Sequence, residues 1–430
     1  FRWLSRRKRT KAGDIDMKLM MIAWRNLMNR KIQTLITLLV VAVGVAMTLG
    51  VINVADGMKK GMAIATEPYG MIVGSKGSAN QLIFNTIYLM DRPLNNLSLE
   101  DYETLKADPR VESAVPFALG DNYEGYRLVG TDEGFFQLRA KPKEPEYFQL
   151  RTGGLFSGPF EAVLGANVAK RTGLSVGDTF NSSHGVISTL HGEEHNKAYK
   201  VVGILKATNA PADKGIYVSM ESYWESHGQH DDSEEAAGET GEAAHEEEPG
   251  VTAVLIKPDS YVNLMTLYQE INNGNAAQAV FPGEVIAKVF DSMGTGEEVL
   301  RIISYVVLGM AGLTTVLSLY GSTLERRRTV SILRAIGASR RVILTVVLLE
   351  SLWMMLFGVL LGYVLNYGVS MLVGQYIESH SSISFILDIS ITYEQLRILV
   401  GVCGIGLAAG FLPAVSAYRT EPVKHLNASV

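Results

Sequence analysis

Long apolar stretches alternate with polar segments along the 430-residue chain. The apolar stretches cover residues 34–56, 300–324, 342–377 and 396–418. A helix needs about 20 apolar residues to cross the hydrocarbon core of a bilayer, and each stretch is long enough. Because unpaired backbone groups are costly in lipid, a helix is the conformation expected for all of them. The pattern predicts a membrane α-helical protein with four transmembrane helices.

Residues 57–299 separate the first two stretches and show a different pattern, in which short apolar runs alternate with turns. Ser98, followed by Asp101, is typical of a helix N-terminus, and Pro109 is expected to stop that helix. Strand-like runs occupy residues 111–116, 126–129, 161–164, 199–205, 215–218 and 251–256. These elements predict an α+β extracytoplasmic domain inserted between transmembrane helices 1 and 2.

Lys and Arg are distributed unevenly around the apolar stretches, and this sets the expected orientation. Residues 1–33 contain ten of them and residues 325–341 contain six, whereas residues 378–395 contain none. Basic loops stay on the cytoplasmic side, so residues 1–33, 325–341 and the tail 419–430 are predicted to be cytoplasmic. Residues 57–299 and 378–395 are then external, and both termini are cytoplasmic.

Composition limits the chemistry that this chain can perform by itself. The net charge of −5 comes from residues 225–248, which hold ten acidic side chains and no Lys or Arg, so charge gives no argument for a nucleic-acid partner. The single cysteine, Cys403, excludes an intramolecular disulfide. No Gly-Lys pair occurs, and the phosphate-binding loop G-x-x-x-x-G-K-[ST] is therefore absent from these residues. We expect no catalytic residues and no cofactor bound by this chain.

Histidines and carboxylates concentrate in one part of the expected external domain. Imidazole and carboxylate groups together suit zinc, and the candidate ligands are His191, His195, His227, His230 and His245. Their spacing matches no closed zinc site, and residues 225–248 are too polar to bury a core. A flexible, acidic and solvated loop at 225–248 is the favoured interpretation, with zinc binding as the alternative.

A basic motif follows the second apolar stretch. Its residues are Glu325, Arg326, Arg327, Arg328, Leu333, Arg334, Gly337 and Arg340. Arginine makes paired hydrogen bonds to carboxylates of a protein partner, although membrane topology or anionic lipid would also account for the charge. Other motifs are Trp24-Arg25-Asn26-Leu27, Gly173-Leu174-Ser175-Val176-Gly177-Asp178 and Tyr418-Arg419. In this order and topology, the motifs resemble the MacB/FtsX-like ABC transporter permeases over nearly the whole chain.

The resemblance implies the permease subunit of a split system, in which ATP and Mg²⁺ bind to a separate ATPase subunit. Expected partners are that ATPase, a second permease copy, the lipid bilayer, and a periplasmic adaptor or substrate-binding protein. The basic motif would couple ATP hydrolysis to the external domain in the bacterial inner membrane, for export or extraction of a substrate from the outer leaflet or periplasm. Alternatives are lipoprotein release, signalling to an external enzyme, and zinc-linked transport through the His-rich loop.

Polar and small residues inside the apolar stretches suggest how the helices pack. A lone carboxylate in hydrocarbon is costly, so Glu350 is interpreted as a polar contact between helices, with a transport role as the alternative. The spacings Gly358-xxx-Gly362 and Gly406-xxx-Gly410 permit close approach of helices. That approach could occur within the chain or between two copies.

The segment before the first apolar stretch has the character of a membrane-surface helix. It is basic, and its expected interfacial anchor residues are Trp24, Arg25 and Leu27. Aromatic and aliphatic side chains on a basic helix are typical of a helix that lies in the interface.

Overall fold

The computed structural model describes residues 12–185, 194–227, 250–325, 339–381, 383–388 and 390–419. The chain divides into two compact units. One, which we call the helical unit, comprises Phe1–Asp56, Gly294–Gly374 and Leu387–Val430. The other, which we call the α+β unit, comprises Gly57–Met293 and Gln375–Ile386.

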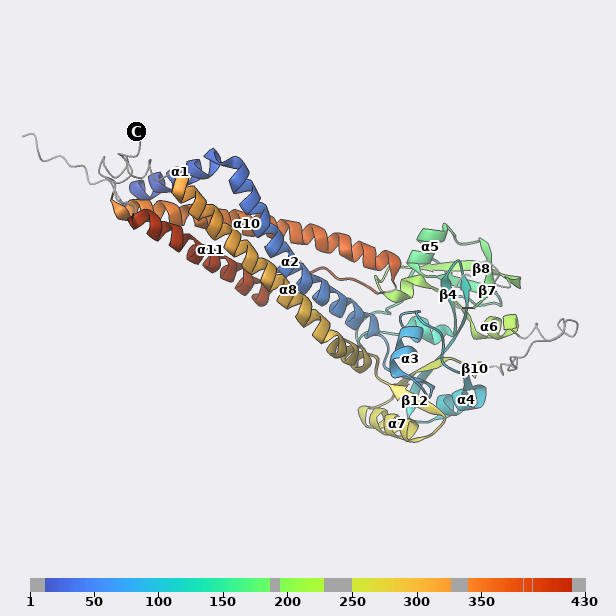
Figure 1. Ribbon diagram of the computed structural model, residues 1–430. Coiled ribbons are helices and arrows are strands. Elements are labelled where there is room, and N and C mark those ends of the chain that lie inside the picture. Colours follow the sequence, from blue (N-terminus) through green and yellow to red (C-terminus); the bar gives the residue numbers. More distant parts are fainter. Residues whose placement is uncertain are drawn as a thin grey trace, which may run out of the picture. The chain divides into compact units, whose positions relative to one another are not determined.

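The long helices are the main feature of the helical unit. Their bounds are α1 (Ala12–Asn29), α2 (Lys31–Thr66), α8 (Pro282–Glu325), α10 (Arg340–His380) and α11 (Tyr393–Arg419). Within the described residues, four of them, α2, α8, α10 and α11, are long and apolar enough to cross a membrane (Figure 1). The helices expected at 34–56, 300–324, 342–377 and 396–418 are therefore present, and all four run beyond the expected bounds.

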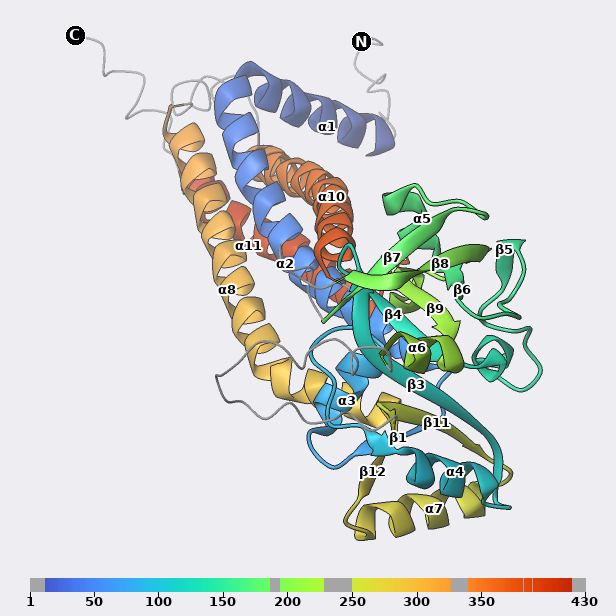
Figure 2. The same ribbon diagram turned by 90° about the vertical axis from the view of Figure 1, so that its right-hand side faces the viewer.

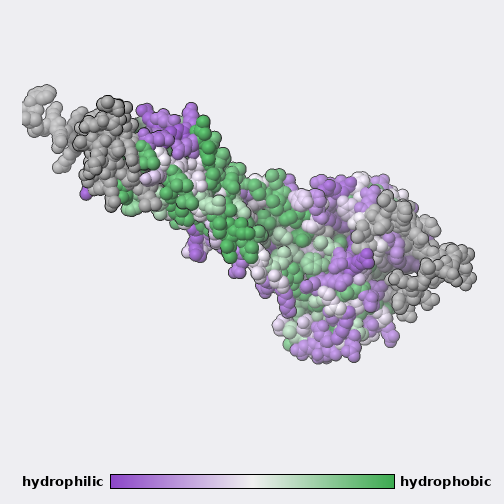
Figure 3. All heavy atoms as spheres, in the orientation of Figure 1, coloured by the Kyte–Doolittle hydropathy of each residue, from purple (hydrophilic) through white to green (hydrophobic). Residues whose placement is uncertain are grey.

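The core of the helical unit is a seam of aliphatic side chains between α2, α8, α10 and α11. Its buried members are Val41, Val45, Leu49, Leu308, Met355 and Val402. Side chains on the outside of the same helices are also apolar, for example Leu317 and Val400, each 63% exposed. Figure 3 shows this surface as largely hydrophobic. A surface of this kind suits lipid rather than water, and the protein is a membrane protein.

Glycines allow the helices of this unit to pack closely. Gly358 and Gly362 of α10 lie against α2, and Gly406 and Gly410 of α11 lie against α10. A Cβ atom at Gly362 would be 2.7 Å from the carbonyl oxygen of Ala42, closer than real Cβ contacts allow. Both glycine pairs thus serve packing within the chain.

A mixed sheet forms the centre of the α+β unit (Figure 2). The strands are β1 (Met71–Ser75), β2 (Leu97–Ser98), β3 (Val111–Tyr123), β4 (Tyr126–Thr131), β5 (Leu150–Gly153), β6 (Glu161–Leu164), β7 (Thr179–His184), β8 (Glu194–Leu205), β9 (Gly215–Ser219), β10 (Gly250–Val251), β11 (Ala253–Pro258) and β12 (Ala277–Val280). As far as the chain is described, ten strands pair in the order β12-β1-β11-β3-β4-β9-β6-β8-β5, with β7 beside β3 and β8. β2 and β10 pair separately. Only β4 with β9 and β6 with β8 are parallel pairs among these described strands.

The sheet is buried on both faces, which explains why its strands are apolar at successive positions. Ile72 belongs to one buried cluster, whereas its neighbours Met71 and Val73 belong to the other. Leu255 and Val254 of β11 divide between the clusters in the same way. Since successive side chains of a strand point to opposite faces, each face has its own core. Helix α3 contributes to the first cluster, and α4 and α7 contribute to the second.

Short helices complete the α+β unit. They are α3 (Ala79–Thr86), α4 (Leu99–Ala107), α5 (Ala166–Thr172), α6 (Met220–His227) and α7 (Tyr261–Asn273), with 3₁₀ turns η1 (Glu133–Gln137) and η2 (Pro211–Lys214). The N-terminus predicted at Ser98 is confirmed, because the Ser98 hydroxyl accepts a hydrogen bond from the Asp101 amide at 3.1 Å. Capping of this kind satisfies an amide that has no partner within the helix.

The structure divides the chain differently from the sequence-based bounds at two places. The external domain was expected over 57–299, but α8 begins at Pro282 and the first segment of the α+β unit ends at Met293. The loop expected over 378–395 instead begins as the last turn of α10, and Gln375–Ile386 belongs to the α+β unit. Apolar content identifies where a helix enters lipid, whereas the helix continues for as long as its backbone hydrogen bonds do.

Candidate functional site

The described part of the basic motif consists of its two ends. Helix α8 ends at Glu325 and α10 begins at Arg340. The motif residues Arg326, Arg327, Arg328, Leu333, Arg334 and Gly337 lie outside the described residues. Glu325 forms an ion pair with Arg30, whose Nη2 atom is 2.5 Å from the Glu325 carboxylate. Because the Glu325 side chain is 68% exposed, this pair contributes only about 0–1 kcal/mol to stability.

Helix α1, which precedes α2, packs on α10 through aromatic side chains. The ring of Trp24 is 5.9 Å from that of Trp353 and 5.3 Å from that of Phe357, centroid to centroid. Leu27 is buried with Leu319 of α8, and Arg25 is exposed. Of the expected anchor residues, Leu27 therefore packs inside the helical unit, whereas Arg25 is exposed. Trp24 remains 41% exposed, as an interfacial side chain would be.

Glu350 is 4% exposed and lies among the apolar side chains of α10. The side-chain amide of Asn26, on α1, donates a hydrogen bond to Glu350 Oε1 at 2.7 Å. A hydrogen bond to a charged group is worth about 1.5–3 kcal/mol and offsets part of the cost of burying a carboxylate. Glu350 thus connects α1 to α10. The sequence analysis named Asn26 only as part of a motif and predicted no contact with Glu350.

A Glu350→Gln substitution is expected to leave the melting temperature nearly unchanged, because the glutamine carbonyl can accept the same hydrogen bond from Asn26. Glu350→Ala removes the acceptor and should destabilise the helical unit by about 1–3 kcal/mol. Thermal unfolding of the purified protein in detergent measures both. Loss of activity in Glu350→Gln at an unchanged melting temperature would instead give the carboxylate a role in transport.

Within the α+β unit, the end of α2 meets the segment that follows α10. A Cβ atom at Gly61 would lie 2.0 Å from the carbonyl oxygen of Ser384, and one at Gly57 would lie 2.6 Å from the ring of Phe385. The amide of Ile386 donates to the carbonyl of Gly57 at 3.2 Å. Sequence reasoning missed this contact. The signal that could have identified it is the four-residue spacing of Gly57 and Gly61, which places both on one side of a helix.

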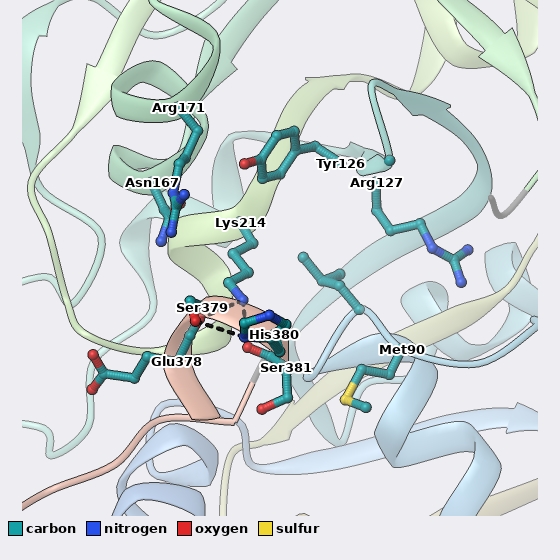
Figure 4. A pocket seen from close by; sticks show the side chains of 12 residues that line it. Met90, Tyr126, Arg127, Asn167, Arg171, Lys214, Glu378, Ser379, His380 and Ser381 are labelled. Carbon is teal, nitrogen blue, oxygen red and sulfur yellow. Dashed lines mark hydrogen bonds between the residues drawn. The ribbon is translucent and has the colours of Figure 1, made fainter. Parts of the chain in front are cut away.

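A basic hollow of about 310 Å³ in the α+β unit surrounds the last turn of α10 (Figure 4). Lys214 points to this turn and donates to the carbonyl oxygens of Glu378, at 3.0 Å, and Ser381. A cation suits a helix C-terminus because the last carbonyls carry negative partial charge. Burial, followed by the nearby charge of Arg171, holds the pKa of Lys214 below its usual value. The sequence analysis did not single out Lys214.

Local structure places Lys214 at this position. Pro211 begins the turn η2, and the carboxylate of Asp213 accepts hydrogen bonds from the amides of Thr208, at 2.9 Å, and Asn209, at 2.8 Å. Burial raises the pKa of Asp213, and these hydrogen bonds oppose the rise. The turn is therefore rigid, and Lys214, its last residue, faces the end of α10.

Among the histidines considered for zinc, His227 is the one whose side chain lies in the described structure. It ends α6, and Asp121 and His184 lie beside it. His191, His230 and His245 lie outside the described residues, and for His195 only the backbone position, in β8, is described. Asp121 was missed because a single acidic residue in a strand gives no sequence signal.

Two family matches cover most of the chain. Residues 34–280 match the MacB-like periplasmic core domain, and residues 301–422 match the FtsX-like permease C-terminal domain. The first match takes in nearly all of α2 and the strands of the α+β unit, and the second takes in the latter part of α8 together with α10 and α11.

Individual relatives agree with these matches. An uncharacterised ABC transporter permease of Methanocaldococcus jannaschii is 26% identical over 249 residues, which are 54% of this chain and 55% of that protein. The uncharacterised ABC transporter permease YvrN of Bacillus subtilis is 22% identical, over 94% of this chain and 98% of its own length. The macrolide export ATP-binding/permease protein MacB of Neisseria meningitidis is 22% identical, over 92% of this chain and 58% of its own. The chain thus spans little more than half of the first and third of these relatives.

Proposed function

Since the chain belongs to the family of MacB/FtsX-like ABC transporter permeases, we propose that it couples ATP hydrolysis on a separate subunit to movement of its α+β unit. The observation that carries the proposal is helix continuity. Among the described helices, α2, α8 and α10 each contribute residues to both units. A helix resists bending because its backbone hydrogen bonds are continuous, so displacement at one end is transmitted to the other.

The proposed topology follows from the long helices and the distribution of Lys and Arg. α2, α8, α10 and α11 cross the bacterial inner membrane as four transmembrane helices, and the α+β unit is inserted between the first two on the outer side. The ten basic residues in 1–33 and the six in 325–341 keep both segments in the cytoplasm. Both termini are then cytoplasmic.

Residues 325–341 are the proposed contact with the ATPase. They connect α8 to α10, two of the helices that contribute to both units, so force applied there would reach the α+β unit through both. Their arginines suit an acidic groove on a protein partner, because guanidinium groups pair with carboxylates through two parallel hydrogen bonds. The ion pair between Arg30 and Glu325 would be one of several contacts between the end of α8 and the start of α2, together with the hydrogen bond from the Gln33 side chain to the Ser318 carbonyl.

The ATPase is proposed to be a separate subunit that holds ATP and Mg²⁺, while this chain performs no catalysis. Support comes from the Bacillus subtilis relative, which matches over 98% of its own length and is named a permease alone. Two permease copies would pair with two ATPase subunits. The proposed work is export, or extraction of a substrate from the outer leaflet or periplasm, with a periplasmic adaptor or substrate-binding protein as a further partner.

The proposal predicts that an ABC ATPase co-purifies with the full-length chain in mild detergent and that Arg334→Glu reduces its recovery several-fold. The substitution places a carboxylate where an acidic groove is expected, and the repulsion should weaken binding. Mass spectrometry of the co-purified proteins measures recovery of the ATPase, and membrane fractionation shows whether insertion is unchanged.

A matched control is Arg151→Glu, the same charge reversal at an exposed position in β5 of the α+β unit. It is expected to leave ATPase recovery unchanged, because β5 would be on the opposite side of the membrane. Equal recovery from wild type and Arg334→Glu, with both chains inserted, would count against the proposed coupling contact.

A further inference from the structure

Three side chains that can bind metal ions come together in the α+β unit: Asp121 of β3, His184 at the end of β7, and His227 at the end of α6. Their ligand atoms all lie within 4.8 Å of one another. We propose that Asp121, His184 and His227 form a binding site for a divalent transition-metal ion, with Zn²⁺ as the expected ion. Two of these residues were absent from the ligands predicted from sequence.

The distances fit an ion held between the three groups. His184 Nδ1 and His227 Nε2 are each 3.3 Å from the same atom, Asp121 Oδ1. A tetrahedral zinc site with bonds of about 2.0–2.1 Å separates its ligand atoms by about 3.3–3.4 Å. A direct N–H···O hydrogen bond is shorter, at about 2.9 Å. Both separations therefore match edges of a zinc coordination tetrahedron.

The pairing of β3 and β7 fixes Asp121 and His184 relative to each other. The strands are antiparallel, and Asp121 is directly opposite His184, so the two side chains leave the same face of the sheet. The side-chain amide of Asn122 donates to the carbonyl of Gly185 at 2.8 Å and holds the end of β7 in place. The Asp121 side chain is fully buried, whereas that of His184 is 55% exposed. The site thus has a rigid base and an opening through which an ion can enter.

Helix α6 brings His227 to the same place because two glycines let the helix approach the sheet. A Cβ atom at Gly120 of β3 would lie 2.6 Å from Tyr223 Oη, and one at Gly130 of β4 would lie 2.9 Å from Tyr223 Cβ. Tyr223 is one helical turn before His227, and its carbonyl oxygen is 2.8 Å from His227 Nδ1. Larger residues at either glycine would lift α6 and move His227 away from Asp121.

The hydrogen bond to Tyr223 determines what His227 presents to Asp121. A carbonyl oxygen can only accept, so His227 Nδ1 carries the proton and donates it. In a neutral imidazole the other nitrogen, Nε2, then has a lone pair directed toward the Asp121 carboxylate. A metal ion between this nitrogen and the carboxylate would be bound by both. Metal-binding histidines in proteins are oriented in this way by a carbonyl or carboxylate on the second ring nitrogen.

The types of ligand select the class of ion. Two imidazoles and one carboxylate suit Zn²⁺ and its first-row neighbours, whereas Mg²⁺ and Ca²⁺ prefer oxygen ligands throughout. Three protein ligands leave a further coordination position for water or an exchangeable ligand. The bound ion would fasten the end of α6 to the edge formed by β3 and β7. This site does not depend on ATPase coupling and can be tested in the absence of any partner.

The test is a Zn²⁺ titration of the full-length chain, purified in detergent and stripped with EDTA, in competition with a chromophoric chelator. Wild type should show one site whose affinity falls at least tenfold in Asp121→Asn, His184→Gln and His227→Gln, because even groups that only orient ligands typically contribute 10–100-fold. His184 is exposed enough for its substitution to leave the fold intact, which circular dichroism would verify.

A matched control separates this site from the other histidines. A variant with His191→Gln, His230→Gln and His245→Gln should retain the tight site, since the proposed site does not include them. X-ray absorption of the Zn²⁺-loaded chain should show nitrogen and oxygen ligands, with imidazole scattering reduced in folded His184→Gln because only His227 remains. Unchanged Zn²⁺ affinity in folded His184→Gln, or loss of the tight site in the triple variant alone, would overturn the proposal.

Discussion

A Gly362→Val substitution is expected to destabilise the helical unit by about 3 kcal/mol, the upper part of the usual cost of overpacking. Even the first added carbon would lie 2.7 Å from the carbonyl oxygen of Ala42 and 2.7 Å from Val45 Cβ, both on α2. A backbone carbonyl cannot rotate away as a side chain can, so α2 and α10 would have to separate. Thermal unfolding in detergent and the amount of chain in the membrane measure the effect, and a several-fold loss of protein is expected.

The matched control is Gly368→Val on the same helix. A Cβ atom at Gly368 has no atom within 4 Å, and the residue is exposed. Both variants change the intrinsic helix propensity of α10 equally, so the difference between them isolates the contact with α2. If Gly362→Val and Gly368→Val accumulated and melted alike, packing of Gly362 within the chain would be refuted in favour of a contact between copies.

Lys214→Glu is expected to release the last turn of α10 within the α+β unit. The substitution replaces a cation that donates to the carbonyls of Glu378 and Ser381 with a carboxylate that repels them. Hydrogen bonds from charged donors are worth about 1.5–3 kcal/mol, so opening of this turn should become more than tenfold more frequent. Amide hydrogen exchange over residues 378–386, followed by mass spectrometry, measures that change.

Two further variants define the cause of that effect. Lys214→Arg retains the positive charge and the donors and should restore slow exchange, whereas Lys170→Glu reverses an exposed charge on α5 and should have no effect. Fast exchange in all three variants would show that the unit had loosened as a whole. Under the proposed function, release of α10 would also disconnect one of the three helices that contribute to both units.

The candidate site was only partly predictable from the sequence. The basic motif and Glu350 were recognised because charged residues are rare in or beside long apolar stretches. Where they occur, they indicate either the orientation of the chain in the membrane or a polar contact between helices. The contacts of Asn26, Lys214 and Asp121 were not predicted, because each is an ordinary polar residue in its own segment. Their importance comes from a partner far along the chain, such as Glu350 for Asn26 and Ser381 for Lys214.

The sequence by itself determined the long apolar helices, the α+β composition of most of residues 57–299 and the family resemblance. Local sequence patterns predict these properties, for example the length of apolar runs and the residues at helix N-termini. Only the tertiary structure decided that the glycine pairs pack within the chain and that Asp121, His184 and His227 meet. Such contacts depend on the register of paired strands and on how closely a helix approaches a sheet. Both are determined by the packing of segments that are far apart in the sequence.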